Sequence, residues 1–191
     1  MTIERTTESQ WDMTIMADLA DDNAMGSLVA GDIDGDGREE IVVGGDKELL
    51  WYRPATAEKG TIATGAFFVG LALKDLNDDG IPEIVTGASL PGLQSCIVWY
   101  ERTPDGEWNR HTIASQCNGG AHDLLFCDID GDGEEELIAN AAYCELWGCF
   151  LYKPGATVSE PWERAVVQEG FAEEGLAVGD ITGNGRLDIV S

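Results

Sequence analysis

The hydrophobic residues of this chain fall in short runs that acidic and glycine-rich segments separate. Runs such as Ile41-Val42-Val43 and Val98-Trp99-Tyr100 are rich in β-branched and aromatic residues, which favour strands. Each run ends after a few residues at Gly, Asp, Asn or Pro, which favour turns. The pattern predicts an all-β fold built from short strands and tight turns.

Four kinds of strand recur in a fixed order. Strand A leads into an acidic loop, strand B leaves it, strand C is aromatic and stops near a proline, and strand D begins with Trp. The ranges are 27–30, 70–73, 123–126 and 175–178 for strand A, 41–43, 83–85, 137–139 and 187–190 for strand B, 50–52, 98–100 and 150–152 for strand C, and 108–113 and 162–167 for strand D. The loops start at positions 32, 75, 128 and 180, a spacing typical of four-stranded propeller blades.

The acidic loops share one layout of oxygen donors. In the first loop, side-chain oxygens stand at positions 1, 3, 5 and 9, a glycine stands at position 6, and position 7 offers its backbone carbonyl. Calcium takes about six to eight oxygen ligands, and a tight glycine turn lets alternate side chains converge on one point. The predicted ligands are Asp32, Asp34, Asp36, Arg38 and Glu40; Asp75, Asn77, Asp79, Ile81 and Glu83; Asp128, Asp130, Asp132, Glu134 and Glu136; and Asp180, Thr182, Asn184, Arg186 and Asp188.

The sequence therefore predicts three to four bound Ca²⁺ ions with a mainly structural role. The first and third loops offer four carboxylates each, the second three and the fourth two. Because affinity follows ligand charge, we expect the fourth site to be the weakest. An EF-hand is excluded, because that loop needs flanking helices and a Glu at position 12, where this chain has Val43, Thr86, Ala139 and Ser191.

These loops between strands resemble those of the FG-GAP or VCBS repeat family of β-propellers, and integrin alpha-chain propellers carry similar loops. The resemblance covers roughly residues 10–191 and implies blades of four antiparallel strands. The expected units are a lone outer strand at 10–16, blades at 26–64, 69–114 and 122–168, and the start of a fourth blade at 174–191. Two interpretations stay open: a piece of a longer propeller, or a ring that closes within one chain or across a homodimer.

Composition narrows the function classes. The 191 residues carry 36 acidic and 11 basic side chains, a net charge of −25. Nucleic acid and anionic membrane surfaces require a basic footprint, so neither is expected as a partner. We expect no membrane insertion, because the chain lacks a long apolar segment, and its polar N-terminus predicts no signal peptide.

Five cysteines bear on the cellular compartment. Cys127 follows the apolar run 124–126 and is interpreted as a buried free thiol. The pairs Cys96–Cys117 and Cys144–Cys149 are plausible disulfides, which would favour an extracellular or cell-surface location. A zinc site formed by some of these thiols with His122 is the alternative, although no CxxC spacing is present.

Function is the least constrained conclusion, because one fold hosts many activities. The first hypothesis is a calcium-binding module that acts as a binding or scaffold domain for protein or carbohydrate, without catalysis. The alternative is the propeller of a carbohydrate-active lyase or dehydratase with its site on the face opposite the calcium loops. The resemblance implies His122 and Glu174 as candidates for acid–base residues there.

Overall fold

The computed structural model describes residues 25–115, 121–141, 147–170 and 174–191. Every regular element in these ranges is a strand, and the strands form three four-stranded antiparallel sheets and one two-stranded sheet. The predicted all-β fold with blades of four antiparallel strands is confirmed. In the part of the chain that the structure describes, no helix is suited to crossing a membrane.

Each sheet is a meander in which consecutive strands pair. The first sheet contains β1 (Met25–Gly31), β2 (Glu40–Gly45), β3 (Glu48–Arg53) and β4 (Glu58–Thr64). The second contains β5 (Ala66–Lys74), β6 (Glu83–Leu90), β7 (Leu93–Arg102) and β8 (Trp108–Ala114). The third contains β9 (Ala121–Cys127), β10 (Glu136–Ala141), β11 (Gly148–Lys153) and β12 (Glu163–Glu169), and the last pairs β13 (Ala177–Gly179) with β14 (Asp188–Val190). The lone outer strand expected at 10–16 lies outside the described residues.

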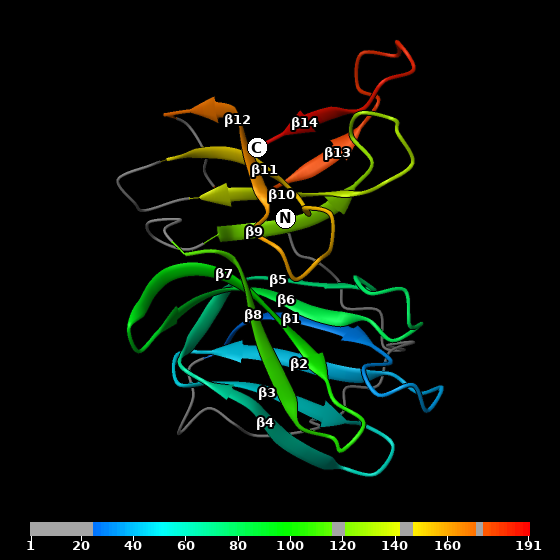
Figure 1. Ribbon diagram of the computed structural model, residues 1–191, viewed down its shortest axis with the longest axis vertical. Helices are drawn as coiled ribbons and strands as arrows, with labels where there is room; N and C mark the ends of the chain where they lie inside the picture. Colours follow the sequence, from blue (N-terminus) through cyan, green and yellow to red (C-terminus); the bar gives the residue numbers. More distant parts are fainter. Residues whose placement is uncertain (1–24, 116–120, 142–146, 171–173) are drawn as a thin grey trace, which may run out of the picture.

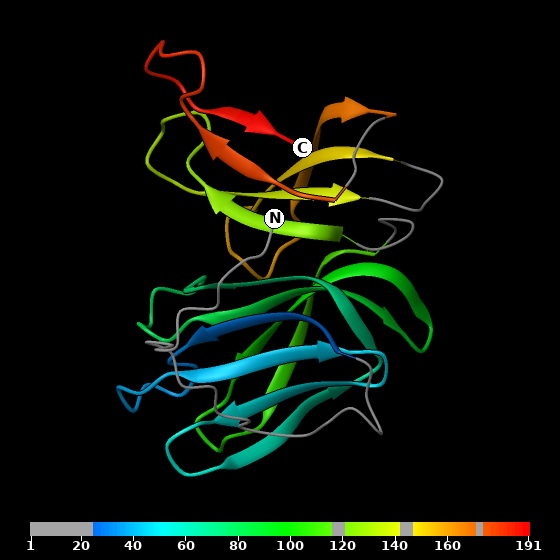
Figure 2. The same cartoon turned by 180° about the vertical axis from the view of Figure 1, so that it is seen from behind.

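The sheets follow one another like successive blades, which we number 1 to 4. Strand β5 packs beside β1, and β9 packs beside β5, so the first strands of successive blades are neighbours (Figures 1 and 2). This arrangement gives the middle blade a partner on each face. Its strand β6 is accordingly buried at seven of its eight positions.

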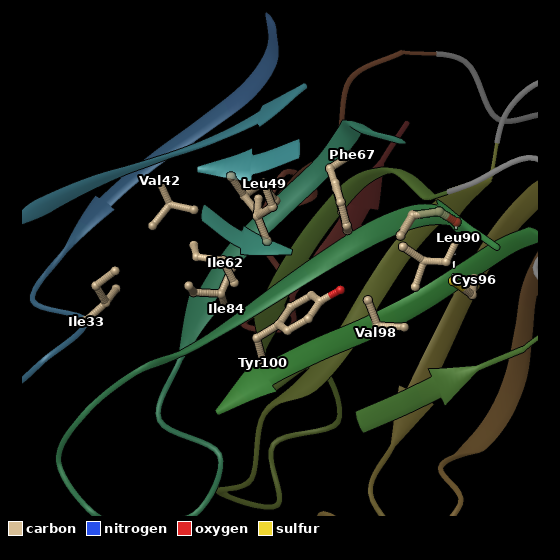
Figure 3. Packing of buried hydrophobic residues seen from close by; sticks show 12 residues of the cluster. Ile33, Val42, Leu49, Ile62, Phe67, Ile84, Leu90, Cys96, Val98 and Tyr100 are labelled. Atoms are coloured by element: carbon tan, nitrogen blue, oxygen red, sulfur yellow. Dashed lines mark hydrogen bonds between the residues drawn. The ribbon is translucent and has the colours of Figure 1, made fainter. Parts of the chain in front are cut away.

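Two hydrophobic cores hold the blades together, and the period-2 alternation of the strands divides the side chains between them. In β7, Val98 and Tyr100 point into the core shared with blade 1, whereas Ile97 and Trp99 point into the core shared with blade 3. Figure 3 shows the first core, where Tyr100 meets Phe67 edge-on with ring centroids 6.3 Å apart. The strands of blade 2 therefore need apolar residues on both faces of the sheet, that is, at odd and even positions alike.

Glycines allow the backbones of neighbouring blades to approach closely. A Cβ atom on Gly44 would lie 1.9 Å from the Phe67 carbonyl oxygen, and one on Gly87 would lie 2.8 Å from the Ala121 carbonyl oxygen. Asn140 takes the corresponding place in β10, two residues after Ile138, and its Nδ2 donates a hydrogen bond to the Gly175 carbonyl at 3.0 Å. At the junction of blades 3 and 4 the Asn140 side chain thus bridges the two blades. At the other two junctions, glycines let the backbones touch directly.

Candidate metal centres

The four predicted metal loops, which we call loops 1 to 4 in chain order, lie on one side of the molecule. Each joins the first two strands of its blade, and all four project to the right in Figure 1 and to the left in Figure 2. The strands of every blade are antiparallel and follow the same order, so the connection between the first and second strands lies at the same end of each sheet. The fold therefore gathers the acidic side chains on one face.

The first residue of each loop organises the turn through its carboxylate. One oxygen of this Asp accepts a hydrogen bond from the backbone N–H of the position-6 glycine, at 2.8 Å for Gly37 and Gly80, 3.0 Å for Gly133 and 2.9 Å for Gly185. All four glycines have positive φ, between 81° and 96°. A non-glycine residue would be strained at this position, which explains the spacing of the motif.

Position 4 is a second left-handed position, which the motif analysis did not identify. Gly35, Gly131 and Gly183 occupy it with φ between 70° and 80°, and loop 2 places Asp78 there with φ 61°. Asp is among the few residues that tolerate this conformation. The recurrence of Gly or Asp three residues after the first ligand was the available sequence signal.

The remaining acidic positions are also held by backbone donors. The position-5 side chain accepts from the N–H of position 7, at 2.9 Å from Asp36 Oδ1 to Arg38 N and 2.8 Å from Asp79 Oδ1 to Ile81 N. The position-9 carboxylate accepts from the N–H of position 2, at 2.7 Å from Glu83 Oε2 to Leu76 N. These bonds occupy some lone pairs and fix the direction of the others, which preorganises the carboxylates.

Loops 1 and 3 bring carboxylates close enough to share one cation. Oxygens of Asp32, Asp34 and Asp36 lie within 4.8 Å of one another, and so do oxygens of Asp128, Asp130 and Glu136; both groups could hold a metal ion. The Glu136 side chain is buried, and its Oε1 lies 3.1 Å from Lys153 Nζ. An all-oxygen donor set that includes a buried carboxylate fits a hard divalent cation such as calcium.

Loop 1 also contacts two arginines. Arg53 donates from Nε to Glu40 Oε1 at 2.7 Å and pairs with Asp34, and Arg102 from blade 2 pairs with Asp34 at 2.9 Å. Burial alone would raise the pKa of Asp34, but the hydrogen bond from Arg102 and the charges of both arginines hold it below its ordinary value. The hydrogen bond to Glu40 raises the pKa of Arg53. The Asp34 carboxylate is therefore ionised at neutral pH.

Among the described residues, Lys153 is the cation that contacts the predicted ligands of loop 3. Lys153 Nζ lies 2.5 Å from Asp132 Oδ2, 3.1 Å from Glu136 Oε1 and 3.7 Å from Asp130 Oδ2. The hydrogen bond from Lys153 lowers the pKa of Asp132. Asp132 is thus drawn to Lys153, which is why the oxygens that cluster most closely in this loop belong to the other three ligands.

Loop 2 differs because its buried carboxylate has only neutral donors. Glu83 is 3% exposed and accepts from Leu76 N and, at 2.8 Å, from Asn77 Nδ2. Burial raises its pKa to about 7, and the charges of Asp79 and Asp75 act in the same direction. Among the described residues no ion pair reaches this carboxylate.

Loop 4 keeps the turn but has fewer charges. Asp188 Oδ2 accepts from Ile181 N and Thr182 N, both at 3.0 Å, and from Thr182 Oγ1 at 3.1 Å. These hydrogen bonds, led by that from Thr182 N, lower the pKa of Asp188. Asn184 Oδ1 accepts from Arg186 N at 2.8 Å, as Asp or Asn does at this position of the other loops. The loop is exposed, and its Thr and Asn supply neutral ligands.

The candidate acid–base residues meet where blade 3 adjoins blade 4. His122 Nε2 lies 3.5 Å from Glu174 Oε1, and His122 Nδ1 lies 3.3 Å from Asp123 Oδ2. Asp123 also accepts from Gly175 N at 2.9 Å. The structure therefore brings His122 and Glu174 together, within a network that also joins the two blades.

Cys127 is a free thiol as expected, although it is only half-buried, whereas the two expected disulfides are not supported. Cys96, Cys127 and Cys149 are free thiols, and the proposed partners Cys117 and Cys144 lie outside the described residues. Cys96 is buried in the first core and donates to the Ala88 carbonyl at 3.3 Å. Burial raises the pKa of its thiol to about 11, which keeps it protonated. Packing inside the sheet accounts for Cys96, and the described cysteines give no support for an oxidising compartment.

Comparison with known proteins agrees with the loop motif. A family model described as an FG-GAP-like repeat matches residues 32–86 and 75–139, which together are more than half of the chain. Each match starts at the first ligand of a predicted metal loop and runs into the next blade. A search of curated proteins found no match.

Proposed function

The chain belongs to the FG-GAP-like repeat family, and we propose that it is a calcium-binding propeller module that serves as a binding or scaffold domain. The observation that carries the calcium proposal is the recurring loop, in which backbone N–H groups orient the acidic side chains at positions 1, 5 and 9. The close approach of three carboxylates in loop 1 and of three in loop 3 supports it further. Four copies on one face make a chance acidic turn a poor explanation.

Calcium would supply positive charge where carboxylates crowd. Thirteen of the 36 acidic residues are predicted side-chain ligands in the four loops, so bound ions would reduce a large local repulsion. Each ion would also tie the first two strands of its blade together. Its role would be structural, and the module would present its other surfaces to a protein or carbohydrate partner.

The experiment is native mass spectrometry in calcium, combined with thermal unfolding with and without a chelator. We expect three to four ions per chain and a lower Tm in excess chelator, because a ligand that binds only the folded state stabilises it. The same spectra report whether the chain is a monomer or a homodimer. An ion-free mass together with an unchanged Tm would refute the calcium proposal.

The enzyme hypothesis rests on the approach of His122 to Glu174 and Asp123. The hydrogen bond from Gly175 to Asp123 offers a structural explanation of the same network, so a scaffold role remains our proposal. Only the enzyme hypothesis predicts that the protein turns over acidic or dehydratable sugars. Turnover that His122→Ala abolishes while Tm is retained would establish the enzyme hypothesis.

A further inference from the structure

One strand position controls which charge faces the buried carboxylate of each metal loop. In blades 1 and 2, Ile41 pairs with Tyr52 and Ile84 pairs with Tyr100, and in blade 3 Leu137 pairs with Tyr152. The position-9 glutamate comes directly before the Ile or Leu of each pair. Because the strands are antiparallel, the residue directly after each tyrosine stands opposite this glutamate. Glu40, Glu83 and Glu136 therefore correspond to Arg53, Glu101 and Lys153.

In blades 1 and 3 this position places a cation on the metal ligands themselves. Arg53 contacts Asp34 and Glu40, and Lys153 contacts Asp132 and Glu136. The Arg53 side chain is only 15% exposed, whereas that of Lys153 is 37% exposed. Arg102 adds a second cation to loop 1.

In blade 2 the same position carries a negative charge. Glu101 contacts His111 Nε2 at 3.3 Å. Lys74, which pairs with Glu83 across the sheet, directs its Nζ to Glu135 in loop 3 at 2.5 Å. Glu83 thus remains buried beside Asp75 and Asp79, with no charge compensation from the described residues.

We propose that the residue after the tyrosine determines how strongly each loop depends on a divalent cation, and that loop 2 is consequently the primary calcium site. This inference rests on the proposed calcium function and deepens it. Arg53 and Lys153 are built-in competitors of the metal in loops 1 and 3. Glu101 leaves loop 2 without a competitor.

The inference reverses the order that carboxylate counting predicts and that the close carboxylate groups of loops 1 and 3 would favour. Loop 1 has four carboxylates but two arginines beside them, and loop 3 has four with one lysine. Loop 2 has three carboxylates, a further acidic residue at Glu101 and, in the described ranges, no ion pair at Glu83. A calcium ion entering loops 1 or 3 must displace a favourable protein cation or share carboxylates with it, and this cost is absent in loop 2.

Reciprocal variants test the inference by calorimetric titration with calcium chloride and by Tm in excess chelator. Glu101→Lys places a cation beside loop 2, and Lys153→Gln and Arg53→Gln remove the cations of loops 3 and 1. The matched controls are Glu169→Lys and Lys59→Gln, which make the same charge changes at exposed strand positions away from the loops. Asp79→Asn and Asp132→Asn identify which binding event belongs to loops 2 and 3.

We expect Asp79→Asn to remove the tightest binding event. Glu101→Lys should weaken that event by about tenfold and raise Tm in chelator, because the new cation compensates Glu83. Lys153→Gln should tighten the event of loop 3 by about threefold to tenfold, since its partly exposed ion pairs are screened by solvent. Arg53→Gln should have the larger effect, because Arg53 is more buried; if it fails to fold, the Lys153 and Glu101 variants still decide.

The outcomes separate the inference from the function on which it rests. If wild-type protein binds calcium but Glu101→Lys matches Glu169→Lys and Lys153→Gln matches Lys59→Gln, the inference is refuted and the calcium function stands. A tightest event that Asp132→Asn removes and Asp79→Asn retains also refutes it. If wild-type protein binds no calcium, both proposals fail.

Discussion

Arg102 at the end of β7 in blade 2 forms an ion pair with Asp34 in loop 1 of blade 1, with 2.9 Å between Nη1 and Oδ2. The contact joins two blades on the side that carries the metal loops. Lys74 of blade 2 similarly reaches Glu135 in loop 3. The loops are therefore coupled to neighbouring blades by charge as well as by the hydrophobic cores.

The first prediction concerns this ion pair between blades. In chelator, Arg102→Gln should lower the free energy of unfolding by about 1 kcal/mol, because both groups are partly exposed and solvent screens them. Urea denaturation of Arg102→Gln and of the control Arg110→Gln measures the difference; Arg110 lies exposed on β8. Equal losses in the two variants would show that the pair with Asp34 contributes nothing to stability.

The second prediction concerns the close approach of blades 1 and 2. Gly44→Ala should destabilise the protein by about 1–3 kcal/mol or more, since the new methyl group would overlap the Phe67 carbonyl. Gly179→Ala is the control, because no atom lies within 4 Å of the added Cβ in β13. Denaturant titration compares them. A Gly44→Ala protein as stable as the control would contradict the packing described here.

The third prediction compares a strongly charged loop with a weakly charged one. Asp132→Ala removes a carboxylate ligand of loop 3, whereas Asn184→Ala removes a neutral ligand of loop 4. In calcium, Asp132→Ala should lower Tm by several degrees and Asn184→Ala by less, because more binding energy is lost. The Tm of each variant in chelator measures the effect of its lost hydrogen bonds alone. The additional loss of Tm in calcium measures the effect of lost calcium binding. A larger calcium-dependent loss in Asn184→Ala would refute the ranking.

The fourth prediction concerns pH and Glu83. Its folded-state pKa is raised to about 7 from 4.5, so the folded protein holds this proton more tightly than the unfolded chain. Its contribution to stability is complete below about pH 4.5 and is lost as pH rises to about 7. In chelator, stability should therefore fall with rising pH across this window, and calcium should reverse the trend because it binds the ionised carboxylate.

Glu83→Gln is the matched variant for this prediction, because it keeps the shape of the side chain and removes its titration. The pH slope in chelator should flatten in this variant when Tm is followed from pH 4.5 to 7. The pKa values of Asp34, Asp132 and Asp188 are lowered, so these groups titrate below that pH window. They should affect the wild-type protein and Glu83→Gln alike. A slope that Glu83→Gln leaves unchanged would assign the effect to other groups.

The sequence by itself determined the fold class, the repeat and the position of the acidic loops, because these depend on local information. Alternating apolar residues define strands, and the fixed spacing of Asp, Gly and Glu defines a turn whose backbone bonds close within nine residues. The sequence also placed His122 and Glu174 on a common face, since each stands six residues before an acidic loop, near the start of the first strand of a blade.

Only the tertiary structure decided what surrounds those loops, because the partners come from distant parts of the chain. Arg53 and Lys153 meet their carboxylates through strand register, and Arg102 reaches loop 1 from the next blade. Cys96 is explained by burial between blades, which spacing along the chain does not reveal. Local hydrogen bonds fix each loop, whereas the balance of charge around it depends on long-range packing, and that balance is the basis of our proposal for loop 2.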